Sequence, residues 1–261
     1  MDIAVKSIVT LLVERDVAVI TMNDPARRNA LGPVMLSGLM RALQDSAGAR
    51  AVVLRAAPGN KVWCAGFDIG ALSPGFDPLA RDGALQGLFR AIEAFPAPVI
   101  AMLDGSAWGG GTDLALRCDI AIGSPACTLA FTPARLGLPY DPEGLSNVML
   151  RGGMSLAMEM FATGDAVVAE RALGAGLLNH VVPSGEIEAF TMGMAGRIAA
   201  NAPLSVASAK AQLRALNAAL PVPAAVLQGL LEGRRAALES ADFTEGLAAF
   251  GEKRKPVFSG R

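Results

Sequence analysis

One glycine-rich segment has residue types and spacing that suit the binding of a polar or negatively charged group. Residues 105–114 read Gly-Ser-Ala-Trp-Gly-Gly-Gly-Thr-Asp-Leu, where a strand is expected to give way to a helix. Glycines let another group approach the backbone closely, and the first turn of a helix presents unpaired N–H groups and the positive end of its dipole. The same segment also suits a tight strand-to-helix turn without a ligand. It is not a phosphate-binding P-loop, because no Gly-Lys-Ser or Gly-Lys-Thr follows.

Side chains that ligate metals or act as nucleophiles are few. His180 is the single histidine, so a site with two histidine ligands cannot form, and we expect no metal. A Ser-His-Asp triad would have to use His180, but no Gly-x-Ser-x-Gly motif accompanies it. The cysteines, Cys64, Cys118 and Cys127, fit no disulfide or zinc pattern, which is typical of a reduced protein.

Charge and hydropathy exclude several classes of partner. The 261 residues include 23 Lys and Arg against 24 Asp and Glu, so the basic excess that nucleic acid or an anionic membrane would call for is absent. Hydrophobic residues make up 52% of the chain, yet no apolar stretch of about 18 residues appears. Residues 1–13 do not match a signal peptide. We therefore expect a cytoplasmic protein whose surplus apolar residues form a large core and subunit interfaces.

The elements that must position the glycine-rich segment alternate between strand and helix. Apolar residues at helical spacing, such as Leu36, Leu39 and Leu43 after Pro33, predict helices. Runs of β-branched and apolar residues predict strands. The expected strands are 7–13, 16–22, 51–55, 98–103, 119–123 and 128–131, and the expected helices are 33–46, 85–94 and 110–117. This alternation indicates an α/β fold built from repeated β-β-α units.

The C-terminal part differs from the rest of the chain. Beyond Pro183 the sequence is rich in Ala and Leu and has little strand signal, and helices are expected at 186–200, 204–218 and 226–238. We place a boundary near residue 200, between a core of residues 1–200 and a helical, oligomerising region of residues 201–261. The Pro- and Gly-rich residues 73–78 are expected to form a loop. Met154, Met158 and Met160 are expected in the core.

A second segment makes the pattern specific. Residues 64–69 read Cys-Ala-Gly-Phe-Asp-Ile and follow an expected strand. Together with the Gly-Gly-Gly run, this A-G-x-D segment resembles the crotonase (enoyl-CoA hydratase/isomerase) superfamily, and the resemblance covers essentially all 261 residues. Further matching segments are Asn29-Ala30-Leu31, Cys118-Asp119-Ile120, Leu136-Gly137-Leu138-Pro139, Gly176-Leu177-Leu178-Asn179 and Glu252-Lys253-Arg254-Lys255. The resemblance implies a crotonase-type spiral of β-β-α units that binds an acyl-CoA, with a helical C-terminal region.

The resemblance assigns the backbone N–H groups of Phe67 and Gly110 to an oxyanion hole. In the family these donors bind the thioester carbonyl of an acyl-CoA and stabilise the enolate. Preorganised donors of this kind contribute on the order of 3–4 kcal/mol each. Because the donors are backbone groups, the phenylalanine side chain at position 67 does not abolish the role.

The acid–base groups of the family are only partly present. Its hydratases place two glutamates around a water. The first aligns with Asp113, a shorter carboxylate, and the second with Pro133, which has no ionisable group. Efficient hydration is therefore not expected, because proton transfer needs groups positioned on the substrate. Asp113 is interpreted as a first-turn helix acid that the dipole favours rather than as a catalytic residue.

Thr132 and Tyr140 indicate a different reaction. The run Phe-Thr-Pro-x-x-Leu-Gly-x-Pro-Tyr over residues 131–140 resembles the subgroup of the family that decarboxylates methylmalonyl-CoA. In that subgroup Thr132 and Tyr140 would orient the substrate carboxylate perpendicular to the thioester plane. The Phe67 and Gly110 amides would stabilise the enolate as CO₂ leaves, and water or Tyr140 would protonate C2. No cofactor is expected, because coenzyme A is part of the substrate.

Position 67 departs from this subgroup, whose members carry histidine there. A more apolar pocket would suit a bulkier 2-alkyl substituent, or would further disfavour a charged carboxylate. Family correspondence also implies contacts with the CoA moiety. Arg27 would lie near phosphate, Phe250 and Lys253 near adenine and the 3′-phosphate, with Lys253 from its own or a neighbouring subunit. Further CoA-binding candidates are Ala26, Arg28, Ala65 and Asp68, the last as a backbone-orienting carboxylate.

The family implies a homotrimer or a dimer of trimers that acts on a small-molecule acyl-CoA. The sequence therefore predicts a biotin- and metal-independent decarboxylase of methylmalonyl-CoA or a related 2-alkylmalonyl-CoA, which forms propionyl-CoA or the corresponding acyl-CoA. Two alternatives remain: an enoyl-CoA hydratase/isomerase, and a catalytically weak acyl-CoA-binding protein.

Overall fold

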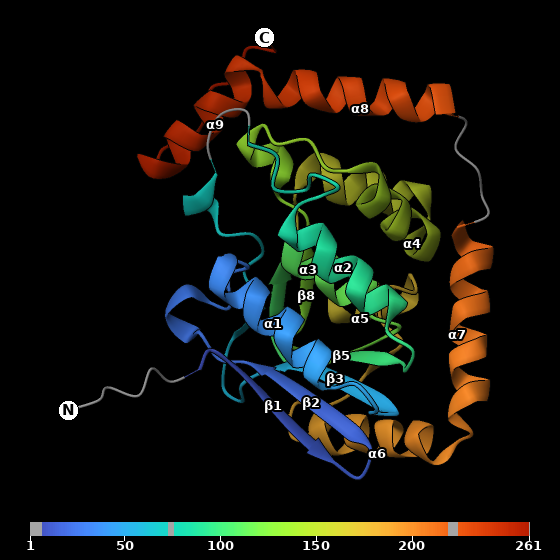
Figure 1. Ribbon diagram of the computed structural model, residues 1–261. Helices are drawn as coiled ribbons and strands as arrows, with labels where there is room; N and C mark the ends of the chain where they lie inside the picture. Colours follow the sequence, from blue (N-terminus) through green and yellow to red (C-terminus); the bar gives the residue numbers. More distant parts are fainter. Residues whose placement is uncertain (1–6, 73–75, 219–223, 261) are drawn as a thin grey trace.

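A computed structural model of the chain describes residues 7–72, 76–218 and 224–260 and has the expected mixed α/β fold (Figure 1). Positions 73–75 of the predicted loop lie outside the described residues. The strands are β1 (Val9–Glu14), β2 (Val17–Met22), β3 (Ala51–Ala56), β4 (Val62–Cys64), β5 (Val99–Leu103), β6 (Ser106–Trp108), β7 (Ile120–Gly123), β8 (Thr128–Ala130), β9 (Val167–Val168) and β10 (His180–Val181).

The helices are α1 (Pro33–Asp45), α2 (Ala84–Ala94), α3 (Gly110–Arg117), α4 (Pro142–Thr163), α5 (Ala169–Gly174), α6 (Ile187–Ala200), α7 (Pro203–Ala218), α8 (Ala224–Leu238) and α9 (Ala241–Gly251). Three short 3-10 helices are η1 (Pro25–Arg27), η2 (Ile69–Ala71) and η3 (Pro133–Leu136). Within the described residues, no helix combines the length and the hydropathy that a membrane crossing requires. Each predicted strand and helix is present, and no end differs from the prediction by more than two residues.

The β-β-α repeat distributes its strands between two sheets. The first strand of each unit, β3, β5 or β7, joins a six-stranded sheet of order β1-β2-β3-β5-β7-β10. The second strand, β4, β6 or β8, joins a four-stranded sheet of order β4-β6-β8-β9. Neighbours within each set of three are parallel, so their carboxyl ends meet at one edge of each sheet. The spiral predicted from the family resemblance is confirmed.

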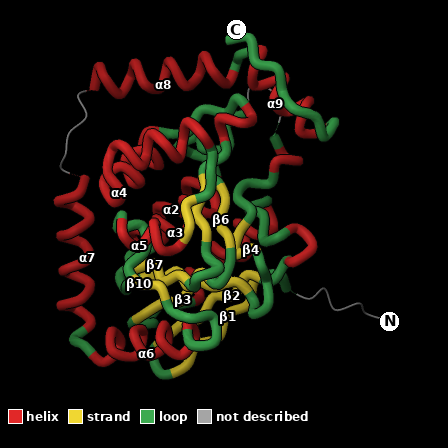
Figure 2. The backbone as a smooth tube through the Cα atoms, turned by 180° about the vertical axis from the view of Figure 1, so that it is seen from behind, coloured by secondary structure: helices red, strands yellow, loops and turns green. Residues whose placement is uncertain are grey.

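The inner strands of the six-stranded sheet, β2, β3, β5 and β7, are buried on both faces, and their side chains alternate between two cores. On β3, Val52 and Leu54 join the core that contains α1, α2 and α3, whereas Ala51 and Val53 face a second core that contains α6. Figure 2 shows α6 along the outer side of this sheet. A strand that is buried on both faces has a nearly continuous run of apolar residues, and this run in Ala51–Ala56 is what predicted the strand from the sequence.

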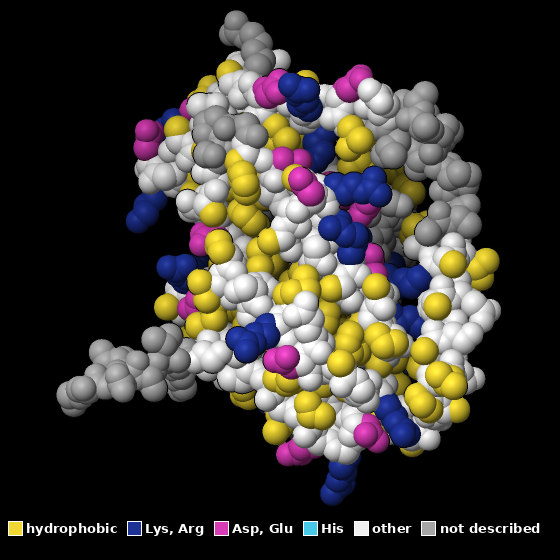
Figure 3. Space-filling view, in the orientation of Figure 1, with side chains coloured by type: hydrophobic (Ala, Val, Ile, Leu, Met, Phe, Trp, Pro, Cys, Tyr) yellow, Lys and Arg dark blue, Asp and Glu magenta, His cyan; other side chains and the backbone are white. Residues whose placement is uncertain are grey.

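The methionine prediction was wrong for two of three residues. Met160 is 1% exposed, but Met154 and Met158 on α4 are 62% and 63% exposed. All three follow the break in α4 at Gly153 (φ +81°). Met154 and Met158 are four residues apart and share the exposed face, whereas Met160 lies with Leu156 on the buried face. Helix α7 also exposes three large apolar side chains, Leu204, Leu213 and Leu216. Hydrophobic side chains gather at the right of Figure 3, on the side where α7 lies. These surfaces fit the surplus of apolar residues noted in the composition.

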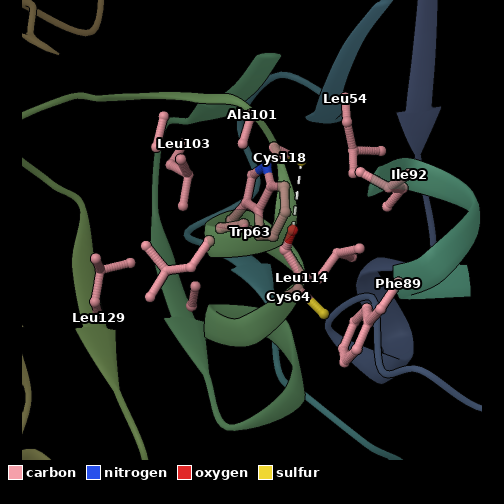
Figure 4. Close-up of a cluster of buried hydrophobic side chains, with 14 of the residues drawn as sticks. Leu54, Trp63, Cys64, Phe89, Ile92, Ala101, Leu103, Leu114, Cys118 and Leu129 are labelled. Carbon is pink, nitrogen blue, oxygen red and sulfur yellow. Dashed lines mark hydrogen bonds between the residues drawn. The ribbon is translucent and has the colours of Figure 1, made fainter. Parts of the chain in front are cut away.

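Beneath α3 lies the most tightly buried part of the molecule. The indole of Trp63, on β4, is fully buried among Leu103 and Leu114 (Figure 4). Cys118 donates a weak hydrogen bond from Sγ to the Leu114 carbonyl at 3.4 Å. A Cβ on Gly111 would lie only 2.8 Å from the Cβ of Cys64, so α3 and β4 approach as closely as glycine allows. This packing fixes the position of the first turn of α3.

The C-terminal helices are joined to the core by both charge and packing. Lys210 on α7 is 8% exposed, and its Nζ lies 2.7 Å from Asp119 and donates to the carbonyls of Ile92 and Ala97 at 3.1 Å. Helix α9 packs on η3, where a Cβ on Gly246 would clash with the Leu136 carbonyl. The division of the chain near residue 200 stays a prediction.

Replacing Lys210 by methionine tests the attachment of α7. The variant leaves the half-buried Asp119 carboxylate with only Arg214 as ion-pair partner and removes the buried ammonium, and we expect the free energy of unfolding to fall by about 3 kcal/mol. Arg41→Met is the matched control, because Arg41 is 84% exposed and surface pairs contribute about 0.5 kcal/mol or less. Urea unfolding followed by circular dichroism measures both. Equal stability of the two variants would contradict the role given to Lys210.

Candidate active site

One pocket lies at the carboxyl edge of the four-stranded sheet. Its empty volume is about 490 Å³, which includes the part that is open to solvent. Its walls come from the segments that follow β4, β6 and β8, and from the loop before α2. The described lining residues are Ala65, Gly66, Phe67, Ile69, Leu72, Pro78, Leu79, Leu85, Gly109, Gly110, Thr132, Pro133, Leu136, Leu138 and Tyr140. The four residues predicted to act on the substrate, Phe67, Gly110, Thr132 and Tyr140, are therefore brought together in one place.

The two predicted oxyanion donors are neighbours because β4 and β6 are neighbours. Both strands end at the same edge, and the chain turns away at Gly66 and at Gly109, each with a positive φ. A Cβ on Gly66 would clash with the Trp108 carbonyl and lie 3.2 Å from the Gly110 nitrogen. A Cβ on Gly110 would lie 3.4 Å from the Phe67 nitrogen. Only glycine at position 66 permits this close approach of the two segments.

Both amides are available to a ligand. Gly110 is the first residue of α3, so its N–H has no partner within the helix. Phe67 forms an isolated parallel bridge with Leu31, in which the Leu31 amide donates to the Gly66 carbonyl. Among the described residues, neither the Phe67 nor the Gly110 amide donates a backbone hydrogen bond. Two unpaired N–H groups on one pocket wall are the arrangement that a negatively charged oxygen requires, and their role stays a prediction.

Thr132 follows β8, the strand beside β6. It precedes η3, but its hydroxyl does not cap that helix, and among the described residues no hydrogen bond engages it. Pro133 is buried and lines the pocket, so an apolar ring occupies the position that aligns with the second glutamate of the hydratases. The pocket therefore has a free hydroxyl but no second carboxylate at this wall.

Tyr140 is held from two sides. Its half-buried ring packs edge-on against Phe131 at 5.1 Å between centroids and also contacts Phe161. Its hydroxyl donates to Oδ2 of Asp113 at 3.1 Å. Asp113 is fully buried, and Arg117, one helical turn later, donates from Nε to Oδ1 at 3.0 Å. The carboxylate thus lies behind Tyr140, with both oxygens engaged, rather than open to the pocket.

Burial controls the protonation of this group. It raises the pKa of the Asp113 carboxyl, and the Arg117 guanidinium opposes that rise. It also raises the pKa of the Tyr140 hydroxyl well above its ordinary value, an effect that the Asp113 carboxylate reinforces. Burial raises the pKa of the Cys64 thiol, beside the oxyanion turn, to about 12. Tyr140 therefore keeps its proton, and Cys64 is a packing residue rather than a nucleophile.

The pocket itself is apolar. None of its described lining residues has a charged side chain. Phe67 stacks at a tilt on Phe76, with ring centroids 6.2 Å apart, so the side chain at this position extends the apolar wall. An uncharged pocket with two convergent N–H donors favours reactions in which negative charge moves onto a carbonyl oxygen.

The predicted CoA-binding residues lie outside the pocket or at its edge. Ala65 lines the pocket, and its amide donates to the Arg28 carbonyl at 2.9 Å. Arg27 ends η1, is 69% exposed and lies 3.8 Å from the Asp68 carboxylate. Asp68 also caps η2 by accepting from the Gly70 amide at 3.1 Å, in line with a backbone-orienting role. Ala26 is exposed on η1.

Phe250 and Lys253 lie at the other end of the chain. Phe250, near the end of α9, is 54% exposed, and Lys253 is exposed in a left-handed conformation just after the helix. Both side chains are therefore free to reach a ligand. Their assignment to adenine and phosphate stays a prediction.

Two features of the site were missed in the sequence. The apolar wall formed by Ile69, Leu79 and Leu85 had no local signal, since these residues look like ordinary core positions. The link between Asp113 and Tyr140 was also missed, because 27 positions separate the two residues. The (i, i+4) spacing of Asp113 and Arg117 was visible and could have indicated a buried ion pair.

Comparison with known proteins places this geometry in a family. The enoyl-CoA hydratase/isomerase profile matches residues 13–261. Methylmalonyl-CoA decarboxylase of Escherichia coli K12 is 41% identical over 247 residues, which cover 94% of this chain and 95% of that protein. A putative enoyl-CoA hydratase of Thermus thermophilus is 34% identical, over 93% of this chain and 97% of that protein.

A solved structure agrees closely with the fold. The crystal structure of methylmalonyl-CoA decarboxylase complexed with 2S-carboxypropyl CoA has a TM-score of 0.94 and 39% sequence identity, and the match covers 98% of this chain and 99% of that one. The match includes the segments that supply Phe67, Gly110, Thr132 and Tyr140, because it spans nearly the whole chain. On the sequence profile, the fold and the paired amides, this chain belongs to the enoyl-CoA hydratase/isomerase family, the crotonase superfamily.

Proposed function

We propose that this protein decarboxylates methylmalonyl-CoA, or a related 2-alkylmalonyl-CoA, to the saturated acyl-CoA. The observation that carries the proposal is one uncharged pocket that joins two unpaired amides, Phe67 and Gly110, to Thr132 and Tyr140. The likeness to the decarboxylase of Escherichia coli, and to a structure of such an enzyme bound to a carboxyl-bearing CoA ligand, supports it.

The pocket favours a reaction that moves negative charge from the substrate carboxylate to the thioester oxygen. The thioester oxygen accepts hydrogen bonds from the Phe67 and Gly110 amides, while Thr132 orients the carboxylate so that the C–C bond stands perpendicular to the thioester plane. As that bond breaks, charge leaves the carboxylate, which the apolar wall solvates poorly, and reaches the thioester oxygen, which meets two donors. Interactions that strengthen toward the transition state raise kcat. No metal or biotin takes part in this proposal.

Hydration of an enoyl-CoA is the alternative. The position of Asp113 and the likeness to a putative hydratase favour it. Against it, the Asp113 oxygens are taken by Arg117 and Tyr140, and Pro133 supplies no second acid or base. A water held for addition needs proton-transferring groups within hydrogen-bond reach. The arrangement supports decarboxylation better.

We also propose a homotrimer or a dimer of trimers. Leu204, Leu213 and Leu216 expose apolar surface along α7, and Met154 and Met158 do so on α4. Patches of this kind on a folded chain mark interaction surfaces. The proposed occupant is a second copy of this chain.

A panel of four substrates tests the reaction. The purified protein is mixed with methylmalonyl-CoA, malonyl-CoA, ethylmalonyl-CoA and crotonyl-CoA, and the products are identified by mass spectrometry. We expect loss of CO₂ from a substituted malonyl-CoA and no change in crotonyl-CoA. Addition of water to crotonyl-CoA with all malonyl esters intact would establish the hydratase alternative instead. Binding of the esters without turnover would indicate an acyl-CoA-binding protein.

The oxyanion donors are tested by a matched pair at positions 110 and 67. Gly110→Pro removes one N–H at the first position of a helix, where proline is tolerated, and we expect kcat to fall by about 100-fold or more. Phe67→Leu keeps its amide and should retain kcat within about tenfold, with a change in preference for the 2-substituent. Circular dichroism checks that both variants fold. A folded Gly110→Pro variant with normal kcat would contradict the oxyanion assignment.

The hydroxyl groups are tested separately. Thr132→Val and Tyr140→Phe each remove one hydrogen bond to a charged group, so kcat/KM should fall by about 10- to 100-fold in each. Ser37→Ala, an exposed hydroxyl on α1, is the control and should leave turnover unchanged. Unchanged turnover in both pocket variants would show that neither group orients the carboxylate.

A further inference from the structure

The hydrogen bond from Tyr140 to Asp113 limits what Tyr140 can offer a substrate. A neutral phenol has a single proton, and here that proton points to Oδ2 of Asp113. An ionised carboxylate accepts hydrogen bonds and donates none. While Asp113 is ionised, Tyr140 therefore turns only lone pairs toward the pocket. Those lone pairs repel a carboxylate, although Tyr140 lines the wall that would receive it.

Protonation of Asp113 reverses the direction of this bond. The carboxylic acid then donates its own O–H to the Tyr140 oxygen, and the phenolic proton becomes free for a carboxylate in the pocket. We propose that a malonyl-type carboxylate binds together with one proton taken up on Asp113, and that this uptake supplies the proton that reaches C2 through Tyr140. The inference rests on the proposed decarboxylase function and deepens it.

The step balances in atoms and electrons. The bond between C2 and the carboxylate carbon breaks, its electron pair forms the thioester enolate, and CO₂ leaves. C2 then forms a C–H bond with the phenolic proton of Tyr140, and the phenolate oxygen takes the proton of Asp113. Asp113 is left ionised and Tyr140 neutral, so the site is ready for another turnover. The overall reaction takes one proton from solvent for each CO₂ released.

The surroundings of Asp113 suit a carboxyl group that changes charge. The charged groups that face it or its partner are Arg117 on α3, Glu93 on α2, and Asp141 and Glu143 at the start of α4. The nearby Asp141 carboxylate and full burial both favour the neutral form of Asp113.

Arg117 tolerates the loss of that charge. Its guanidinium lies 3.0 Å from Glu93 and 3.8 Å from Glu143, in addition to its bond with Asp113. It therefore keeps the Glu93 and Glu143 side chains as ion-pair partners when Asp113 is neutral. When Asp113 gives up its proton, Arg117 is already in place to stabilise the carboxylate that forms.

Asp113 thus has a role that differs from the one the sequence suggested. It is neither a helix-dipole acid alone nor a residue that touches substrate, because Tyr140 lies between it and the pocket. It is a positioning residue that sets the hydrogen-bond direction of Tyr140 and passes a proton through it. The reaction then needs no second carboxylate at the position of Pro133.

Calorimetry of ligand binding tests the coupling. Wild-type protein is titrated with 2S-carboxypropyl-CoA, which bears a carboxylate but has no thioester carbonyl to drive decarboxylation, in buffers of different ionisation enthalpy at neutral pH. We expect uptake of about one proton per ligand bound, and affinity that weakens up to about tenfold per pH unit above the pKa of Asp113 in the free protein. Propionyl-CoA, which has no carboxylate, should bind without proton uptake.

Two variants separate the role of Asp113 from that of its neighbours. The side-chain amide of Asp113→Asn can donate to the Tyr140 oxygen permanently. This variant should therefore bind 2S-carboxypropyl-CoA with no proton uptake and no dependence on pH, and its kcat on methylmalonyl-CoA should fall by about 100-fold or more with little change in KM. Glu143→Gln should keep the proton uptake. A melting curve checks that Asp113→Asn folds. If that variant does not fold, the titration of the wild-type protein still tests the inference.

The outcomes are distinct. Binding of 2S-carboxypropyl-CoA to the wild type without proton uptake overturns this inference and leaves the proposed function intact. Proton uptake that persists in Asp113→Asn also overturns it. Binding of propionyl-CoA but not of 2S-carboxypropyl-CoA contradicts the proposed function, and this inference with it.

Discussion

The close approach of two backbone turns is the constraint on which the site depends. Gly66 and Gly110 meet where a side chain at position 66 would clash with the Trp108 carbonyl, and the result is two unpaired amides on one wall. The parallel pairing of β4 with β6 sets the turns side by side, and the packing of α3 on Cys64 and Trp63 holds them there (Figure 4). Backbone donors held in this way do not have to reorganise when charge develops, which is the physical basis of their effect.

Behind this wall the protein keeps an unusual number of charges out of water. Asp113, Arg117 and Asp141 are all at least 95% buried. A buried ion pair is weak evidence of stabilisation, since desolvation offsets much of the attraction. The effect of this ion pair is on Tyr140, because its Asp113 carboxylate accepts the hydrogen bond of the Tyr140 hydroxyl at the pocket wall. The pocket lining is therefore uncharged, and the Asp113–Arg117 ion pair is separated from it by Tyr140.

Local signals in the sequence predicted most of the fold. Helix α3 begins and ends at the predicted residues, and the hairpin between β1 and β2 turns at Arg15 and Asp16, which both have positive φ. Helix α4 was missed because Gly152 and Gly153 interrupt its pattern. Strand β6 was missed because Gly105 and Gly109 bound its three residues, and β4 was expected only as a strand of unstated bounds before residues 64–69. Phe67, Gly110, Thr132 and Tyr140 were predicted to share a site through family resemblance, and the fold brings them to one pocket.

The division of each β-β-α unit between two sheets has a consequence for how such proteins diversify. The first strands form the six-stranded sheet, which contributes to both hydrophobic cores, whereas the second strands are short and end at the pocket. Substitutions just beyond β4, β6 and β8 therefore alter chemistry without disturbing the main core. Pro133 illustrates this: its ring offers no proton-transfer group, and the unpaired amides of Phe67 and Gly110 on another wall of the pocket do not depend on it. An ancestral scaffold that stabilises enolates can thus acquire or lose reactions one loop at a time.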